Sequence, residues 1–314
     1  MSLVQRVSAK FEGSKAALSL LGVILIALGG VAVPAQAAFK SITTCNPTLA
    51  VSSGGSLINA AGDYQLTGNL TQSTANTDCI QITASNVSLK LNGHQITSTA
   101  GGGSGIDVNP SGPPQVSHVA IQGPGLIQGF QNGIFFLDAN YSQVDLVTAA
   151  NNTYGIYGFN TTSLTIGSNV LVRNGQWGLL LGNSTGGTIQ NNEASGNGAA
   201  TAAGGFSGGI GLGGASNANT VNNNTASGNG PQSVVPAIAA GILIGGAGNG
   251  NRVYGNTTDG NIFAGIQVKS TGNSIFGNSS VGNGAYDLED DNPACDSNLW
   301  GGNNFFTANQ ACIH

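Results

Sequence analysis

The 314-residue sequence predicts an all-β solenoid, because three features recur along the chain. Gly, Asn, Ser and Thr dominate beyond residue 37, and no segment there has the periodicity of an amphipathic helix. A Gly followed by Ile or Leu returns about every 22 to 24 residues, and an Asn-containing motif keeps step with it. Short apolar runs between these motifs alternate with period two. Together these observations predict a single-stranded, right-handed parallel β-helix of about ten coils.

The first 37 residues have the pattern of a secretory signal peptide. A basic segment that ends at Lys15 precedes an apolar run over residues 16–33, and the small residues at Ala35 and Ala37 form a cleavage site. The apolar run is long enough to span a bilayer, so an uncleaved anchor is the alternative. Pro34 and the cleavage site favour removal. We therefore expect an exported protein with no membrane span after cleavage.

The apolar residue of each Gly-Ile unit is expected to point into the solenoid. One coil cannot bury its own apolar face, but coils stacked at about 4.8 Å can, so these residues should form one internal column. The predicted column consists of Ile106, Ile134, Ile156, Leu179, Ile210, Ile242 and Ile266. At the corners, Asn tolerates the sharp turn and can hydrogen-bond from coil to coil. We expect Asn192, Asn224, Asn256 and Asn278 to stack in this way.

The four cysteines follow an export signal and predict two disulfides, for which three pairings are possible. The simplest pairing joins Cys45 with Cys79 and Cys295 with Cys312, which closes both ends of the solenoid, where strand edges are unpaired. We accordingly expect residues 38–78 to form an N-terminal cap with the first coils, residues 79–287 the β-helix repeats, and residues 288–314 a disulfide-bonded C-terminal cap.

Several segments carry a likeness to a known family. These are Cys79–Ile82, Asn86–His94, the repeated Gly-Ile and Thr-Ile-x-x-Asn units, and the ending Asp287–Cys295. They resemble the right-handed parallel β-helix repeat proteins of bacteria, a class with NosD-like and pectate-lyase-like members. The resemblance implies the fold and a bacterial, secreted, periplasmic or cell-surface location. It is weak for function, because the class includes lyases, polygalacturonases, mannuronan epimerases, adhesins and members of unknown role.

An enzyme on this fold would place its chemistry on outward side chains of successive coils. The residue after each Gly-Ile unit gives Asp107, Phe135, Tyr157, Leu180, Gly211, Leu243 and Gln267. This column contains no ladder of carboxylates, so no catalytic residue is assigned. It offers an apolar run that could stack on sugar rings. The stacking candidates are Phe135, Tyr157, Leu180 and Leu243, with Tyr254 and Phe276 as a second pair.

Two further features each have two interpretations. The insertions Ala199–Ser207 and Pro231–Ala239 form either an apolar flap over the solenoid or part of a binding face. The acidic residues Asp287, Glu289, Asp290 and Asp291 could hold calcium. Because their spacing matches no calcium loop, we expect a solvated, turn-forming cap instead. No other cofactor is expected, since the few histidines and the paired cysteines do not suggest a copper site.

The leading functional hypothesis is a non-catalytic, exported protein that binds a polysaccharide or the cell envelope, or serves in adhesion or structure. The rival is a polysaccharide-active lyase, hydrolase or uronate epimerase. If Lys90, Arg252 or Lys269 meets two or more carboxylates in an outer groove, the binding hypothesis gives way to the rival. With 8 basic residues, 13 acidic residues and a net charge of −5, the chain has no basic surface for nucleic acid.

Overall fold

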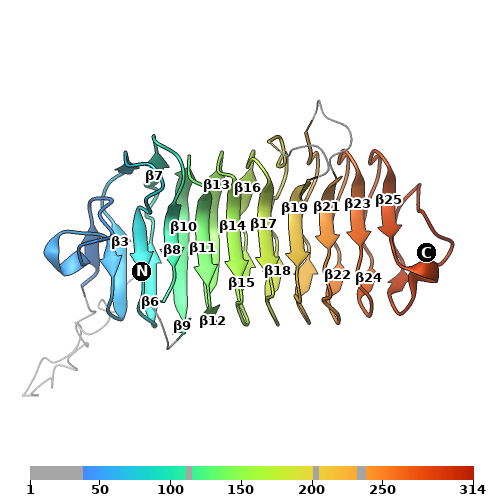
Figure 1. Ribbon diagram of the computed structural model, residues 1–314, viewed down its shortest axis with the longest axis horizontal. Coiled ribbons are helices and arrows are strands. Elements are labelled where there is room, and N and C mark those ends of the chain that lie inside the picture. Colours follow the sequence, from blue (N-terminus) through green and yellow to red (C-terminus); the bar gives the residue numbers. More distant parts are fainter. Residues whose placement is uncertain (1–37, 111–114, 201–204, 232–237) are drawn as a thin grey trace, which may run out of the picture. The chain divides into compact units, whose positions relative to one another are not determined.

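The computed structural model describes residues 38–110, 115–200, 205–231 and 238–314. These residues form an all-β solenoid whose strands lie side by side along its length (Figure 1). The two strand-rich faces are a ten-stranded sheet and a fourteen-stranded sheet, and every recorded pairing is parallel. A β-solenoid of about ten coils was predicted, and the structure confirms it.

The ten-stranded sheet takes one strand from each coil. In spatial order its strands are β2 (Leu57–Ile58), β5 (Ile80–Ile82), β8 (Ser104–Val108), β11 (Asn132–Leu137), β14 (Tyr154–Phe159), β17 (Trp177–Gly182), β19 (Phe206–Gly213), β21 (Ile238–Ile244), β23 (Ala264–Val268) and β25 (Tyr286–Asp290).

The fourteen-stranded sheet forms the opposite side of the coils and takes two strands from some of them. It contains β1 (Lys40–Ile42), β3 (Gly62–Leu66), β4 (Leu70–Gln72), β6 (Val87–Lys90), β7 (Gln95–Ser98), β10 (Val119–Gln128), β13 (Gln143–Ala150), β15 (Thr165–Gly167), β16 (Val170–Val172), β18 (Thr188–Gln190), β20 (Thr220–Asn222), β22 (Arg252–Tyr254), β24 (Ser274–Phe276) and β26 (Leu299–Gly301). A small third sheet pairs β9 (Val116–Ser117) with β12 (Ala139–Asn140), and two short 3-10 turns lie at Val51–Ser53 and Pro293–Cys295.

The predicted internal column is confirmed. Strand register pairs its seven members in order, from Ile106 with Ile134 to Ile242 with Ile266, and all seven are fully buried. The column continues one coil further in each direction, to Ile80 and Leu288. Glycine precedes these residues for a steric reason: a side chain at Gly155, for example, would lie 2.5 Å from the carbonyl oxygen of Gly178 in the next coil.

The predicted asparagine stack is also confirmed. Nδ2 of Asn192 donates to Oδ1 of Asn224, and the same bond joins Asn224 to Asn256 and Asn256 to Asn278, at 2.9 to 3.0 Å. The ladder extends to Asn169 at one end and to Asn303 at the other.

Two more ladders occur at other corners. One runs through Asn152, Asn174, Asn197, Asn229, Asn261 and Asn283, and the other through Asn219, Asn251, Asn273 and Asn298. In all three ladders Nδ2 points toward the C-terminal coil, so each ladder has a direction.

Both expected disulfides are formed, Cys45 with Cys79 and Cys295 with Cys312. They lie near the two ends of the solenoid. The predicted signal peptide (residues 1–37) lies outside the described residues, as do the central parts of both insertions (residues 201–204 and 232–237), so the signal and flap predictions remain predictions. Within the described part of the chain, no helix has the length and apolar character needed to cross a membrane.

Candidate functional site

One continuous outward column runs along the ten-stranded sheet. In order it consists of Gln81, Asp107, Phe135, Tyr157, Leu180, Gly211, Leu243, Gln267 and Glu289. The seven coil steps from β8 to β25 correspond to roughly 34 Å at about 4.8 Å per step. The structure therefore brings Phe135, Tyr157 and Leu180 together as adjacent residues, whereas Gly211 separates Leu180 from Leu243. The two acids of the column stand near its opposite ends, so it holds no carboxylate ladder.

The aromatic part of this column is wider than the sequence suggested. The ring centroids of Phe135 and Tyr157 are 5.2 Å apart, and Tyr154 and Phe159 pack beside Tyr157 at 5.4 and 6.4 Å. All four side chains are half-buried. Burial raises the pKa of both tyrosine hydroxyls, which therefore stay protonated at neutral pH. Tyr154 and Phe159 were missed because only one residue per coil was selected.

A cavity opens where the column is interrupted by Gly211. Its volume is about 270 Å³, and its walls are Trp177, Leu180, Phe206 and Leu243, with glycines between them and Lys269 at one side. Trp177 is only 4% exposed although it lies on the outer face of the sheet. Its ring packs over the next coil, where a side chain at Gly208 or Gly211 would come within about 3 Å of it. The lack of side chains at these glycines leaves room for the Trp177 ring, and the ring forms one wall of the remaining cavity.

Beyond this cavity the column ends in a charged cluster. Lys269 forms an ion pair with Asp291, and Nε2 of Gln267 lies 3.4 Å from Oδ2 of the same aspartate. Burial raises the pKa of Glu289 to about 7, and both the charge of Asp291 and a hydrogen bond to it add to this effect. One oxygen each of Gln267 and Glu289 is buried without a hydrogen-bond partner. Lys269 thus pairs with one carboxylate, Asp291, and its charge also acts on Glu289, which partly meets the arrangement expected of an enzyme.

A second carboxyl pair lies near the start of the column. Asp107 is 5% exposed, and burial together with the charge of Asp78 raises its pKa to about 7. Burial also raises the pKa of Asp78, whose Oδ1 accepts a hydrogen bond from the Ser104 N–H. Oδ1 of Asp107 is buried without a partner. The negative charge of Asp78 therefore favours the protonated form of Asp107. Asp78 precedes β5 outside the repeated positions, which is why the pair was not predicted.

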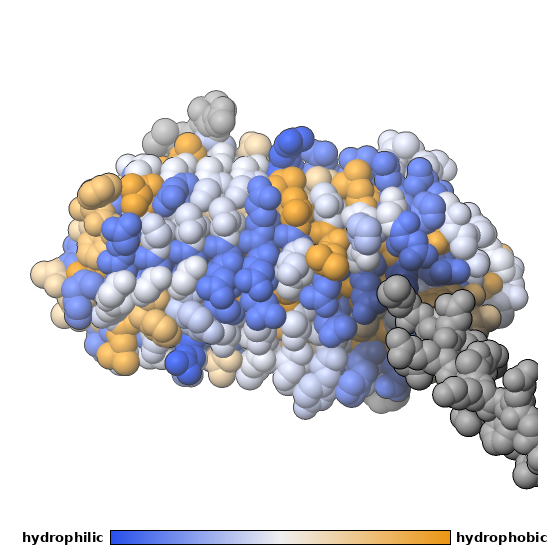
Figure 2. Space-filling view, turned by 180° about the vertical axis from the view of Figure 1, so that it is seen from behind, coloured by the Kyte–Doolittle hydropathy of each residue, from blue (hydrophilic) through white to orange (hydrophobic). Residues whose placement is uncertain are grey.

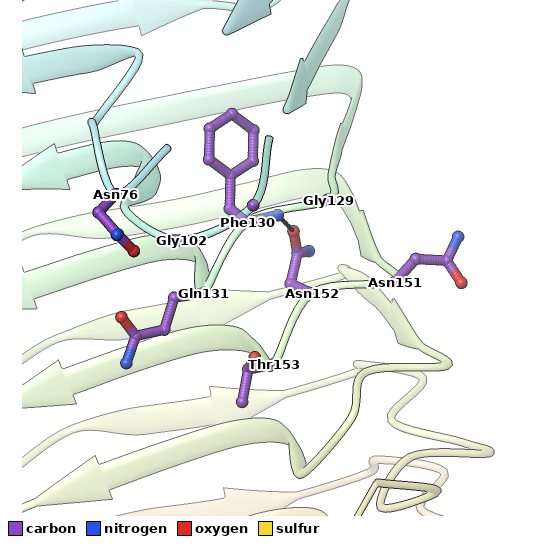
Figure 3. Close-up of a pocket in the computed structure, with 9 residues that line it drawn as sticks. Asn76, Gly102, Gly129, Phe130, Gln131, Asn151, Asn152 and Thr153 are labelled. Carbon is purple, nitrogen blue, oxygen red and sulfur yellow. Dashed lines mark hydrogen bonds between the residues drawn. The ribbon is translucent and has the colours of Figure 1, made fainter. Parts of the chain in front are cut away.

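A polar groove of about 490 Å³ lies at the corners that precede β11 and β14 (Figure 3). Asn76, Gln131, Asn151 and Thr153 contribute polar side chains around it, while Gly102 and Gly129 leave the backbone open. The Phe130 N–H donates to Oδ1 of Asn152, the first member of its ladder. The residues that line this groove carry no charge, so it offers amides and hydroxyls for hydrogen bonding next to the aromatic part of the column.

The second stacking pair lies on the other sheet. Tyr254 and Phe276 are adjacent in β22 and β24, with centroids 5.1 Å apart and rings nearly parallel, and Arg252 lies near the Phe276 ring. The structure therefore does not join this pair to the first four candidates. The side of the molecule away from the viewer of Figure 1 shows mostly hydrophilic and neutral residues, with hydrophobic patches near its middle and toward the C-terminal end (Figure 2). Exposed residues at that end include Phe276, Leu299 and Phe306.

The expectation of a solvated acidic cap is wrong for three of its four residues, one of which is Glu289 at 8% exposed. Asp287 and Asp290 are 1% and 0% exposed. The carboxylate of Asp287 accepts four N–H donors, including Nδ2 of Asn283, the last amide of one ladder. Asp290 likewise accepts Nδ2 of Asn298, which ends another ladder, and the Trp300 indole N–H. These acids are buried because they terminate ladders. Among the described residues, no group of three or more His, Cys, Asp or Glu is arranged to hold a metal.

Comparison with known proteins places this geometry among β-helices. The family model described as "Right handed beta helix region" matches residues 55–226. The A-module of mannuronan C-5 epimerase AlgE6 from Azotobacter vinelandii superposes with a TM-score of 0.62 at 18% identity, covering 78% of this chain and 67% of that module. An alginate lyase from Paenibacillus sp. gives 0.56 at 15% identity, covering 88% and 99%. Pectate lyase Pel9A gives 0.53 at 13%, covering 87% and 79%. No curated protein sequence matches the chain.

Proposed function

Since the chain belongs to the right-handed β-helix family, we propose that it is an exported protein that binds a polysaccharide along the outer face of its ten-stranded sheet. One observation carries the proposal: half-buried aromatic and aliphatic side chains stand in adjacent coils on one face and lead into an apolar cavity. Sugar rings present apolar C–H faces that such side chains cover well. The two disulfides fit an oxidising compartment outside the cytosol.

Two further features support a carbohydrate ligand. The polar groove beside β11 and β14 supplies uncharged amides and hydroxyls suited to sugar hydroxyl groups. The solved structures with this architecture include enzymes named for alginate, mannuronan and pectate, which are polysaccharides. A face roughly 34 Å long suits a polymer better than a monosaccharide. Binding of this kind would serve adhesion or attachment to the cell envelope.

The test compares two tyrosines on opposite sheets. Tyr157→Ala removes the centre of the aromatic cluster, whereas Tyr254→Ala removes a half-buried tyrosine from the other sheet. Protein lacking residues 1–37 is assayed for retention on a panel of neutral and uronate polysaccharides immobilised in native gels. We expect Tyr157→Ala to weaken retention by about tenfold and Tyr254→Ala to leave it unchanged. Equal retention of both variants, or none by the unaltered protein, contradicts the proposal.

A second candidate function is catalysis on an acidic polysaccharide, and the cluster of Lys269, Glu289 and Asp291 favours it. Glu289 with a pKa of about 7 can hold or release a proton near neutral pH. A carboxyl group that exchanges its proton near neutral pH beside a lysine suits elimination or epimerisation, each of which begins with proton abstraction.

This candidate is tested by incubating the protein with uronate and neutral glycans, with and without calcium. Formation of an unsaturated product, or a change in uronate configuration by proton NMR, that is lost in Lys269→Met and retained in Lys90→Met would support it. Lys90 is the control because it lies on the fourteen-stranded sheet. Retention of the polymer without any product would refute catalysis and leave binding intact.

A further inference from the structure

The cavity at Gly211 differs in chemistry from the rest of the proposed binding face. Its walls come from three successive coils, β17, β19 and β21, and they are the side chains of Trp177, Leu180, Phe206 and Leu243. The glycines at 211, 213 and 245 take the places where outward side chains would fill it. At the position of Gly211 the two adjacent coils carry Leu180 and Leu243, and the coils beyond them carry Tyr157 and Gln267, so the cavity is local to this part of the column.

A bare sugar ring does not match this lining. Its hydroxyl groups would lose hydrogen bonds to water and find almost no polar side chain in return, which is unfavourable for each buried hydroxyl. An apolar group gains contact with all four walls instead. A volume of about 270 Å³ accommodates on the order of nine water-sized groups. The occupant is therefore apolar and of medium size.

Lys269 gives the cavity one polar point. Its ammonium group lies 5.7 Å from the centre of the Phe206 ring and is paired with Asp291, so the local charge is balanced. A balanced ammonium at the edge of an apolar space suits a neutral oxygen acceptor, such as the carbonyl of an ester or amide, more than a second full charge.

We propose that this cavity receives an acyl substituent of the polysaccharide, with the alkyl or aromatic part between Leu180 and Leu243 and its carbonyl oxygen toward Lys269. This inference rests on the proposed function, polysaccharide binding by the outer face of the ten-stranded sheet, and specifies which chemical group of the polysaccharide binds at the cavity. The column of Phe135 and Tyr157 holds the sugar chain, and the cavity selects chains that carry the substituent.

Gly213→Leu tests the inference by filling the cavity. A Cβ at Gly213 would have its nearest neighbours at 3.8 and 4.0 Å, so the backbone admits a side chain there without strain. The control is Gly301→Leu, the same change on the outer strand β26 of the other sheet, where nothing lies within 4 Å of the added Cβ. Gly245→Leu is a second filling variant, with nearest neighbours at 3.6 and 3.7 Å.

The probes are methyl glucopyranoside that carries a 6-O-hexanoyl group and the same glycoside without it, measured by tryptophan fluorescence, to which the cavity wall Trp177 contributes. We expect the hexanoylated glycoside to bind the unaltered protein and Gly301→Leu at least about tenfold more tightly than it binds Gly213→Leu and Gly245→Leu. Equal affinity for all four proteins overturns the inference, as does absence of binding to the unaltered protein.

Two further measurements distinguish failure of the acyl site from failure of the proposed polysaccharide binding. If native and alkali-deacylated polysaccharides are retained equally, the acyl site is refuted while polysaccharide binding stands. If no polysaccharide is retained but the hexanoylated probe binds the cavity, the proposed function fails instead. Sedimentation of Gly213→Leu is compared with that of the unaltered protein, because a change in oligomeric state would identify the cavity as an interface between copies and would also refute the acyl site.

Discussion

The carboxylate of Asp287 provides the sharpest test of how the solenoid is held together. Oδ1 accepts the backbone N–H and Nδ2 of Asn283, at 3.1 and 3.0 Å, and Oδ2 accepts the N–H groups of Phe306 and Thr307, at 2.9 and 3.0 Å. Asp287→Asn keeps the shape of the side chain but replaces one oxygen by an NH₂ group. Whichever way the amide turns, two N–H donors lose their acceptor and face another donor.

The cost follows from those two donors. A hydrogen bond to a charged group contributes about 1.5 to 3 kcal/mol, so losing two destabilises the protein by about 3 to 6 kcal/mol. For a unit of this size the loss corresponds to a decrease in Tm of about 5 to 10 °C. The measurement is urea and thermal denaturation followed by circular dichroism. Asp296→Asn is the matched control, because Asp296 lies in the same cap, is exposed and should change stability by less than about 0.5 kcal/mol.

The pH dependence of this difference has a definite sign. Burial raises the pKa of Asp287, but the N–H donors of Asn283, Phe306 and Thr307 outweigh it, so the pKa lies below its usual range. The stabilisation is therefore present above about pH 4 and is lost as pH falls through the folded-state pKa. The gap between unaltered protein and Asp287→Asn should shrink in acid. A variant as stable as Asp296→Asn, or a gap that closes when calcium is chelated, would refute the ladder explanation.

Three other changes have expected outcomes. Asp107→Asn should flatten the pH profile of stability: because burial raises its pKa to about 7, the unaltered protein should lose up to about 4 kcal/mol between about pH 4 and pH 7, measurable by denaturation across that range. Asn224→Ala should cost about 2 to 6 kcal/mol in the same assay, because two buried N–H donors of Asn192 lose their acceptor. Replacing Cys45 and Cys79 by Ala should lower stability by about 4 kcal/mol, and reductant should then destabilise that variant less than the unaltered protein in thermal unfolding.

The fold was predictable because the same physical requirement recurs in every coil. Each coil must bury apolar residues and turn corners at the same positions, so Ile and Asn return at a fixed interval, and the seven-membered core column follows from the spacing alone. The disulfides were predictable for a related reason, since the two ends of a solenoid are the places without a neighbouring coil.

The site was less predictable, because it depends on features that occur once. The outward column was correctly ordered, but the cavity exists because Trp177 turns over the glycines of the next coil, a side-chain direction that spacing does not give. The charged cluster could have been found. Lys269 and Asp291 are 22 residues apart, as are Gln267 and Glu289, which is one coil period, so each pair had to be adjacent. Asp78 lies outside the repeat and gave no such signal.

The direction of the asparagine ladders explains why Asp287 and Asp290 are buried at the C-terminal end of the solenoid. At the N-terminal end of each ladder, Oδ1 accepts a backbone N–H, as Asn152 does from Phe130 and Asn219 does from Gly187. At the C-terminal end the last amide has an N–H to donate and no further coil to accept it. Asp287 and Asp290 supply that acceptor in two of the three ladders. A carboxylate can only accept hydrogen bonds, so it suits the C-terminal end of a ladder. At the N-terminal end it would face the Oδ1 atom of the next asparagine, which would repel it.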